Sequence, residues 1–378
     1  MSHSTTATPM RRPAAPTASV AALALAAALA TAAGGCRMAP GVHYEERSQV
    51  TMPLAPQTQL VIENSRGSVR LVSGDSGAVH IEAHKRAFAI TERRARRLAS
   101  EVKVHVDRIG DRFEIRVEYP RRIDTSNVHI EWFGQDMPRR RADVDLVISV
   151  PRGVPTRVET RSGDLYADET AGSLEFETTS GDAEIEKHTG PLTVRSTSGD
   201  VTATLVNGDF EMSTTSGDLS LEKVAGQLNF ESTSGDLAAR VVEGPLTVKT
   251  VSGDVSVSRV LGITSVTTVS GDVVLRDASG NLEVGSSSGD VSAVVQADMQ
   301  KIAIETTSGD VALKLPEELR GRLEVRTSSG EVEAHIPMTL ERATRRQLDA
   351  VLGAGSQLTS VHTSSGDVAI GFVSAEKR

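Results

Sequence analysis

A Ser-Gly-Asp triplet recurs at a fixed interval through the second half of the chain. It begins at Ser162 and returns every 18 residues up to Ser288, then recurs at Ser308, at Ser329 as Ser-Gly-Glu, and at Ser365. The late intervals are 20, 21 and 36 residues, so insertions enter the final units and the last interval is two periods long. Self-similarity at a fixed period indicates a repeat architecture.

Each unit divides into two similar halves. A second glycine follows the first after nine residues, in the series from Gly172 to Gly280. Apolar residues alternate with others after both turns, as at Leu219 and Leu221 and again at Leu228 and Phe230. Period-two alternation predicts short strands. A glycine every nine residues, with abundant Val, Thr and Ser, excludes a helix here.

The two predicted strands of one unit are too small to be stable alone. Stacking each unit on the next gives two parallel sheets facing each other across a thin aliphatic core, with coils about 4.8 Å apart. Such a core needs few large rings, and aromatic residues make up only 3% of the chain. We therefore predict an all-β fold, a two-sheet parallel β-solenoid with 18-residue coils.

Two inward-facing corner ladders are expected in this stack. One comprises Val206, Val224, Val242 and Val260, and its partner comprises Thr179, Thr197, Thr215, Thr233, Val251 and Val269.

The beginning of the chain has the features of an export signal. Arg11 and Arg12 precede an uncharged, Ala-rich run from Ala18 to Ala33, which is short for a permanent membrane span and typical of a signal peptide. Cys36 is the only cysteine and follows two glycines, and this arrangement resembles the cleavage box of bacterial lipoproteins. In that interpretation residues 1–36 carry the signal and Cys36 becomes the lipidated first residue of the mature protein.

Two observations qualify the lipoprotein interpretation. Ala33 stands where the lipoprotein pattern prefers Leu, and ordinary cleavage near Ala30-Thr31-Ala32 would instead leave a soluble secreted protein. Both routes export the chain. The following stretch, residues 37–56, contains Pro40, Pro53 and Pro56 and is predicted to be a tether.

Residues 57–150 are predicted to form a first coil and a cap, and residues 151–378 the solenoid. An open sheet edge invites end-to-end pairing, so a repeat array of this kind needs such a cover. The expected elements are strands at Gln59–Ile62, Ser68–Val72, Val79–Ala83 and Ala142–Val150, a helix at Thr91–Ser100, and a hairpin of Glu101–Asp107 with Arg112–Tyr119. Another Ser-Gly-Asp, at Ser73, follows the second of these strands.

Three further segments carry predictions of their own. Leu340–Val351 is expected to be a helix inserted in a late coil, where it would cover an edge. Trp132-Phe133 lies in a Pro- and Gly-flanked loop and is either an exposed binding tip or part of the cap. The arginines of the first half, including Arg93, Arg94 and those at 139–141, form either a solvated face or a contact for anionic lipid or glycan.

The repeated aspartates are the candidate site residues. In the predicted stack the following would line one edge: Asp164, Asp182, Asp200, Asp218, Asp236, Asp254, Asp272 and Asp290. Like charges one coil apart repel by about 1 kcal/mol per pair even in water. Two interpretations would offset this repulsion.

The first interpretation of the aspartates is a structural turn, in which glycine takes a positive φ and the Ser and Asp side chains bond to nearby backbone. The alternative is a calcium ladder, because calcium prefers carboxylate and carbonyl oxygens. Calcium β-rolls carry an aspartate in both half-turns, whereas here only Asp209 interrupts a second turn that otherwise lacks one. The turn interpretation is favoured, with no cofactor expected.

Net charge and isolated histidines exclude other classes of function. The net charge of −9 and pI of about 5.6 argue against a nucleic-acid binder, which needs a basic face. His188 and His335 have no nearby nucleophile or metal ligand in the sequence. The regular coils, poor in Trp and Tyr, disfavour a polysaccharide lyase or hydrolase, whose chemistry needs a local break with paired carboxylates.

A family resemblance rests on one passage and on the coils that follow it. Val144–Asp164 consists of a strand, Val-Pro-Arg-Gly-Val, a second strand and Arg-Ser-Gly-Asp, and many Ser-Gly-Asp coils come after it. This resembles the candidate-adhesin family of bacterial β-strand-repeat proteins, a domain of unknown function, over about residues 58–378. The resemblance implies a β-solenoid at the cell envelope, often membrane-attached, and it defines no catalytic residues.

The leading functional hypothesis is a non-enzymatic, exported envelope protein with an adhesin-like or scaffolding surface. Its expected partners are a membrane, through the lipid on Cys36, and a glycan or an envelope protein. The alternatives are an envelope-stress sensor, a calcium-binding β-roll and a β-helix enzyme acting on polysaccharide.

Overall fold

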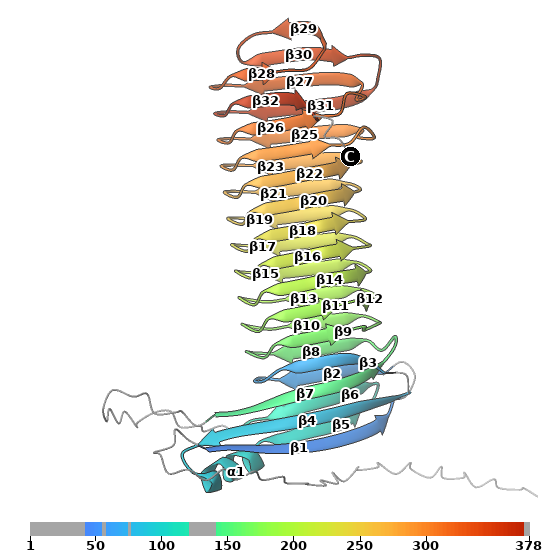
Figure 1. Ribbon diagram of the computed structural model, residues 1–378, viewed down its shortest axis with the longest axis vertical. Helices are drawn as coiled ribbons and strands as arrows, with labels where there is room; N and C mark the ends of the chain where they lie inside the picture. The colour runs from blue at the N-terminus through green and yellow to red at the C-terminus, as the bar shows by residue number, and fades with distance from the viewer. Residues whose placement is uncertain (1–41, 55–57, 75–76, 121–140, 374–378) are drawn as a thin grey trace, which may run out of the picture.

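The described part of the chain folds into one long rod of stacked coils (Figure 1). The computed structural model describes residues 42–54, 58–74, 77–120 and 141–373. The end that carries the helix is called the base, and the opposite end is called the tip. The signal segment with Cys36, the first residues of the predicted tether, Asp75 and Trp132-Phe133 lie outside the described residues.

Two 16-stranded sheets make up the described rod, and they are named here sheet A and sheet B. From base to tip, sheet A contains β1 (Val42–Pro53), β4 (Ala78–Ala89), β7 (Arg141–Pro151), β3 (Val69–Gly74), β9 (Leu165–Asp168), β11 (Ala183–Glu186), β14 (Val201–Asn207), β16 (Leu219–Val224), β18 (Leu237–Val242), β20 (Val255–Leu261), β22 (Val273–Ser279), β24 (Val291–Val295), β26 (Val311–Leu315), β32 (Val368–Phe372) and β28 (Val332–Ala334), with β12 (His188–Thr189) beside β14.

Sheet B faces sheet A across the core, and each coil contributes strands to both sheets. From base to tip it contains β5 (Lys103–Ile109), β6 (Arg112–Glu118), β2 (Gln59–Asn64), β8 (Thr156–Thr160), β10 (Leu174–Glu177), β13 (Leu192–Arg195), β15 (Phe210–Thr214), β17 (Leu228–Ser232), β19 (Leu246–Thr250), β21 (Thr264–Thr268), β23 (Asn281–Ser286), β25 (Lys301–Thr306), β31 (Gln357–Thr363), β27 (Gly321–Thr327), β30 (Gln347–Leu352) and β29 (Thr339–Ala343).

Neighbouring coils stack in parallel and in register. Leu219 pairs with Leu237, which pairs with Val255, so each residue lies beside its equivalent 18 positions along the chain. Inward residues of both sheets are buried, and the valine corner from Val206 to Val260 is 0–2% exposed. These observations confirm the predicted solenoid and its thin core.

The other predicted corner is wrong by one position. Val251 and Val269 are 47% and 46% exposed, and the threonines at the same position face solvent. The preceding residue points inward instead, as Thr178 and Thr250 do. Its hydroxyl has a hydrogen-bonding task in the turn, which alternation counted from the strand alone does not reveal.

The base largely follows the prediction. β2 and β3 form a first coil under β8 and β9, and β5 and β6 form the expected hairpin. The helix α1 (Glu92–Glu101) packs Ala95, Leu98 and Ala99 inward, against β1 and β4. Part of the predicted tether is instead β1, which pairs antiparallel with β4 along its full length.

The tip departs from the prediction in two ways. Leu340–Val351 is not a helix, because β29 and β30 form an antiparallel hairpin on the edge of β27. Leu348, Ala350 and Leu352 face inward at period two, and pairing with the open edge of β27 overrides the helix propensity of this segment.

The coils of the tip also do not stack in chain order. β31 lies between β25 and β27, and β32 lies between β26 and β28. The chain therefore passes over one coil position, builds the tip, and returns to fill the position with its C-terminal coil (Figure 1). The interval of 36 residues between the last two triplets contains the hairpin of β29 and β30 and the return of the chain in β31.

Candidate functional site

The aspartates of the Ser-Gly-Asp turns line one edge of the rod, as the sequence predicts. Each aspartate lies between a strand of sheet B and a strand of sheet A; Asp164 is half-buried and the others are exposed. The backbone N–H of Asp236 donates to the Oδ1 atom of Asp218 at 2.8 Å, and that of Asp254 donates to Asp236 at 2.8 Å. This contact recurs at 2.8–3.1 Å from Asp164 to Asp310.

The ladder continues through the rearranged tip in spatial order. Asp367 donates its N–H to Asp310, and Glu331 donates its N–H to Asp367. Asp209, the one aspartate of the second turn, makes the same contact with the N–H of Gln227 at 3.0 Å. A carboxylate that accepts a backbone N–H forms a charge-assisted hydrogen bond, and this offsets the repulsion between neighbouring aspartates.

From Gly181 to Gly289, a hydroxyl three residues before each turn glycine completes the turn. Thr250 Oγ1 accepts the N–H of Gly253 at 2.9 Å, and Ser232 Oγ accepts that of Gly235 at 2.6 Å. The sequence interpretation missed this ladder. Its signal is the Thr or Ser that recurs at 178, 196, 214, 232, 250, 268 and 286.

The turn glycine is required for a reason other than the predicted one. These glycines do not have a positive φ; instead, a Cβ on Gly217 would lie 2.0 Å from the carbonyl oxygen of Gly199 in the coil below. Any side chain would therefore force the coils apart. At the base, Gly67 lies beneath Gly163 and, unlike the turn glycines above it, has a positive φ of 88°. Gly74 is therefore not the member of the series that underlies Gly163.

Across the described residues, no group of three or more His, Cys, Asp or Glu side chains is arranged to hold a metal ion. Along the edge, one oxygen of each carboxylate up to Asp310 already accepts a backbone N–H. In this arrangement the aspartate side chains bond to nearby backbone, which is the contact that the turn interpretation describes.

A shallow groove runs beside the aspartate edge toward the tip. It has a volume of about 360 Å³ and crosses β22, β24, β26 and β32. Asp272, Asp290, Asp310 and Asp367 form one side. Its floor consists of the short side chains Val274, Ser292, Ala312 and Ala369, which point outward from sheet A. The volume matches a small-ligand site, but the groove is open along its length.

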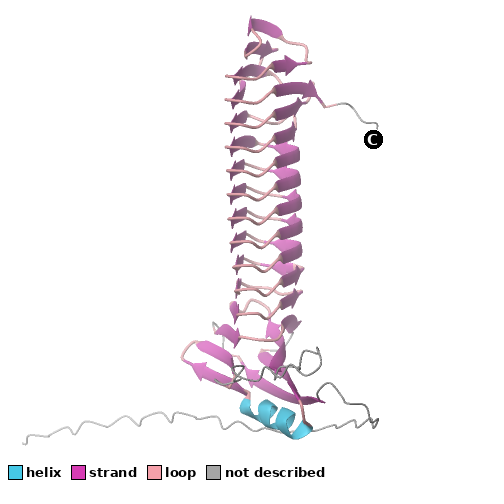
Figure 2. Cartoon of the chain, turned by 90° about the vertical axis from the view of Figure 1, so that its left-hand side faces the viewer, coloured by secondary structure: helices cyan, strands magenta, loops and turns pink. Residues whose placement is uncertain are grey.

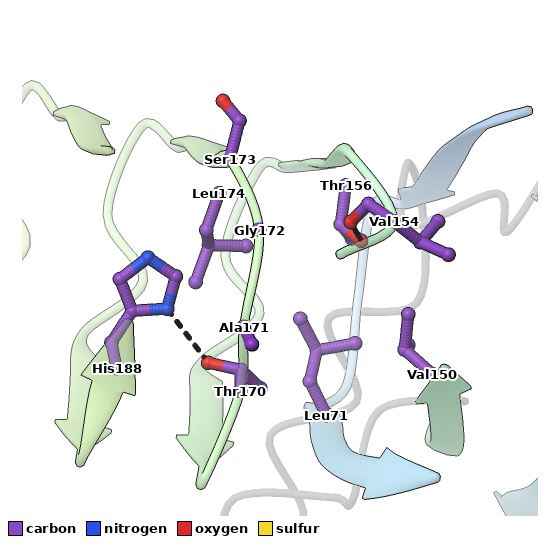
Figure 3. Close-up of a pocket in the computed structure, with 10 residues that line it drawn as sticks. All are labelled: Leu71, Val150, Val154, Thr156, Thr170, Ala171, Gly172, Ser173, Leu174 and His188. Atoms are coloured by element: carbon purple, nitrogen blue, oxygen red, sulfur yellow. Dashed lines mark hydrogen bonds between the residues drawn. The ribbon is translucent and has the colours of Figure 1, made fainter. Parts of the chain in front are cut away.

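His188 occupies the first position of the valine corner and lines a second hollow (Figure 3). Its Nδ1 atom lies 2.9 Å from Thr170 Oγ1, and the ring is 1% exposed. Burial lowers the pKa of His188, so the ring is neutral. The hollow holds about 10 Å³, the size of one water molecule and too small for a substrate.

In the described part of the chain, no helix is both long and apolar enough to cross a membrane.

Comparisons with known proteins identify the fold. The family model described as Toastrack DUF4097 matches residues 57–262 and 209–371. A search of the curated proteins finds no match.

Solved structures similar to this chain include proteins from three bacteria. A candidate cell adhesion protein from Clostridium sporogenes is 8% identical, with 86% of this chain and 100% of that chain covered and a TM-score of 0.23. A candidate adhesin from Bacteroides fragilis is 12% identical, covering 71% and 96%, with a TM-score of 0.34. A candidate lipid-binding protein from Parabacteroides distasonis has the same identity and coverage and a TM-score of 0.32.

Proposed function

We propose, from the premise that this chain belongs to the Toastrack DUF4097 family, that it is an exported, non-enzymatic protein of the bacterial cell envelope. Its rod presents an adhesin-like surface to an extended partner, a glycan or an envelope protein. In this proposal the lipid on Cys36 holds the base at a membrane.

The groove beside the aspartate edge is the observation that supports this function. Over four coils its floor offers only Val, Ser and Ala side chains, while the carboxylates of one side stay exposed. An extended chain could lie on that floor and donate hydroxyl, amide or amine hydrogens to the carboxylate edge. The same outward position also carries small side chains in the coils below the groove, at Ser220, Ala238 and Ser256. It becomes bulky only near the base, at Tyr166 and Glu184.

The regularity of the edge supports a non-catalytic role. Catalysis by carboxylates needs members in different environments, so that one is an acid and the other a base. Here each aspartate repeats the contact of its neighbour, with one oxygen accepting the N–H of the next coil. Because their surroundings are equivalent, no carboxylate is distinguished as the acid or as the base.

The test is a binding screen with a matched pair of groove variants. Purified full-length chain would be applied to a glycan array and used to capture envelope proteins and peptidoglycan fragments. Ala312→Phe fills the groove from β26, and Ala303→Phe places the same ring outward on β25, in the same coil but on the opposite sheet. The proposal expects Ala312→Phe to lose at least tenfold in affinity and Ala303→Phe to bind as wild type.

Two outcomes would contradict the proposal. Equal binding by the two variants would move the site away from the groove. Turnover of a captured glycan by the wild-type chain would show an enzyme.

A further inference from the structure

The base of the rod carries a basic surface on which two arginines form no ion pair with another described residue. It consists of Ile90 and the outward face of α1, with Arg93, Arg94 and Arg97, and is called here the base patch. α1 lies at the end of the molecule opposite the tip (Figure 2). Ala95, Leu98 and Ala99 face β1 and β4, so the arginines face away from the protein.

Ion pairing within α1 leaves two of its four arginines free among the described residues. Arg96 pairs with Glu92 at 2.8 Å, and Arg97, 81% exposed in its side chain, pairs with Glu101 at 3.0 Å. Arg93 and Arg94 form no ion pair with any other described residue. The exposed positive charge of the base patch is therefore concentrated in the first turn of the helix.

That placement is unfavourable for the helix itself. The N-terminal end of a helix carries a partial positive charge, which favours acidic side chains there and disfavours basic ones. α1 has Arg93 and Arg94 in its first turn beside one acidic residue, Glu92, whose charge is paired with Arg96. It has no basic residue in its last turn and no side-chain hydrogen bond from Thr91 at its N-cap. An external anion at this end would be attracted by the arginines and by the helix together.

The path of the chain brings the base patch close to the proposed anchor. Val42 pairs with Ala89, and Ala89 is followed by Ile90 and the first turn of α1. Cys36 precedes Val42 by six residues, and six residues span at most about 20 Å when fully extended. A lipid on Cys36 would hold Val42, and with it the neighbouring start of α1, close to the bilayer surface. Ile90, 52% exposed, adds an apolar side chain at the same corner.

We infer that the base patch binds the headgroups of anionic lipids, so that the rod stands with its base on the membrane. Arg93 and Arg94 contact lipid phosphates, and Ile90 enters the boundary between headgroups and acyl chains. This inference extends the proposed membrane attachment but does not depend on the groove or its ligand. It also does not require lipidation, because the patch itself supplies the contact.

The test measures vesicle binding of the full-length, unlipidated chain by co-sedimentation. Vesicles of phosphatidylglycerol with phosphatidylcholine are compared with pure phosphatidylcholine vesicles, which report any contribution of the apolar N-terminal segment. The base variant is Arg93→Gln with Arg94→Gln. The control is Arg345→Gln with Arg346→Gln, exposed arginines in the turn between β29 and β30 at the tip, with the same change in charge.

The inference expects binding that prefers anionic vesicles and weakens as salt rises. A basic residue near an anionic surface contributes about fivefold in affinity, so the base variant should bind about 30-fold more weakly and the tip control as wild type. The base variant should also have a higher thermal unfolding temperature, because removing the arginines relieves the unfavourable interaction with the helix dipole.

Three results would overturn the inference. The first is equal binding by the base and tip variants, and the second is equal binding to both kinds of vesicle. The third is displacement of the wild-type chain from vesicles by a soluble anionic polysaccharide, when the same polysaccharide does not displace the base variant. The last result would assign the patch to a glycan. Failure of the groove ligand screen would leave this measurement unaffected.

Discussion

At the Ser-Gly-Asp turns from Gly181 to Gly289, three residues meet three separate physical requirements. The hydroxyl of Thr250 accepts the N–H of Gly253, the missing side chain of Gly253 admits the carbonyl of Gly235, and Asp254 accepts the N–H of Asp272. The turn thereby satisfies its own donors and binds the next coil. A substitution at any of the three positions acts on the contact between coils as well as on the local turn.

Two buried threonines of β21 give a paired prediction at this scale. Thr264 is fully buried and its Oγ1 atom has no hydrogen-bond partner, whereas Thr268 Oγ1 accepts the N–H of Gly271 at 3.0 Å. We expect Thr264→Val to raise the free energy of unfolding by about 1 kcal/mol, and Thr268→Val to lower it by about 1–3 kcal/mol. Urea denaturation of both variants provides the measurement. Equal effects of the two substitutions would contradict this account.

His188 gives a prediction of pH dependence. Burial lowers its pKa in the folded state, whereas the pKa of a histidine in the unfolded chain is about 6.5. The unfolded state therefore binds more protons once the pH falls below about 6.5, and stability decreases there by up to about 1.4 kcal/mol per pH unit. His188→Val, which continues the corner at Val206, should remove this component of the slope between pH 7 and pH 5. Parallel slopes for wild type and variant would refute the assignment.

Among the elements, the C-terminal coil has the most consequential position. β31 and β32 are the last strands in the chain, yet each lies between two strands made earlier. Without them β25 and β26 would become exposed edges, β27 would keep only its pairing with β30, and β28 would lose the strand it pairs with. The tip is therefore incomplete until the end of the chain has been added.

Truncation tests the role of this coil. Deleting residues 357–378 should abolish hydrogen-exchange protection in β27–β30 and cause association through the open edges, detectable by size-exclusion chromatography. Deleting only residues 374–378 is the control and should leave both properties unchanged. Retained protection at the tip after the longer deletion would show that β27 can pair directly with β25.

Whether an element could be predicted from the sequence depended on its regularity. The repeat predicted the coils, the aspartate edge and the valine corner, because each residue there has the same neighbours in every coil. The prediction of a helix failed at Leu340–Val351, where helical spacing competes with pairing to β27. That competition is decided by residues of β27, which are distant in the sequence. The groove was also missed: stacking in chain order aligns Val274, Ser292 and Ala312, but Ala369 joins them only when β32 is placed beside β26.

At the scale of the whole molecule, the rod carries a continuous line of negative charge. The aspartate edge extends from Asp164 to Asp367 with each carboxylate bonded to the coil above. Repulsion between exposed charges is reduced by salt, with a screening length of about 10 Å at 0.1 M. The stability of the rod should therefore respond to ionic strength more than to the identity of the cation.

Calcium addition and removal test this expectation. We expect the thermal unfolding temperature to be the same in EDTA, in CaCl₂ and in MgCl₂ when NaCl keeps the ionic strength equal, because backbone N–H groups already occupy an oxygen of each carboxylate. A rise specific to calcium, larger than that given by magnesium, would show that the edge binds calcium as a ladder.

The equivalence of the coils also has an evolutionary consequence. Because every coil from Asp182 to Asp290 offers its neighbour the same contacts, an extra copy of 18 residues can join the stack without disturbing either end. Each tandem duplication in the gene would lengthen the molecule by about 4.8 Å. The number of units then sets the distance between the groove and the base.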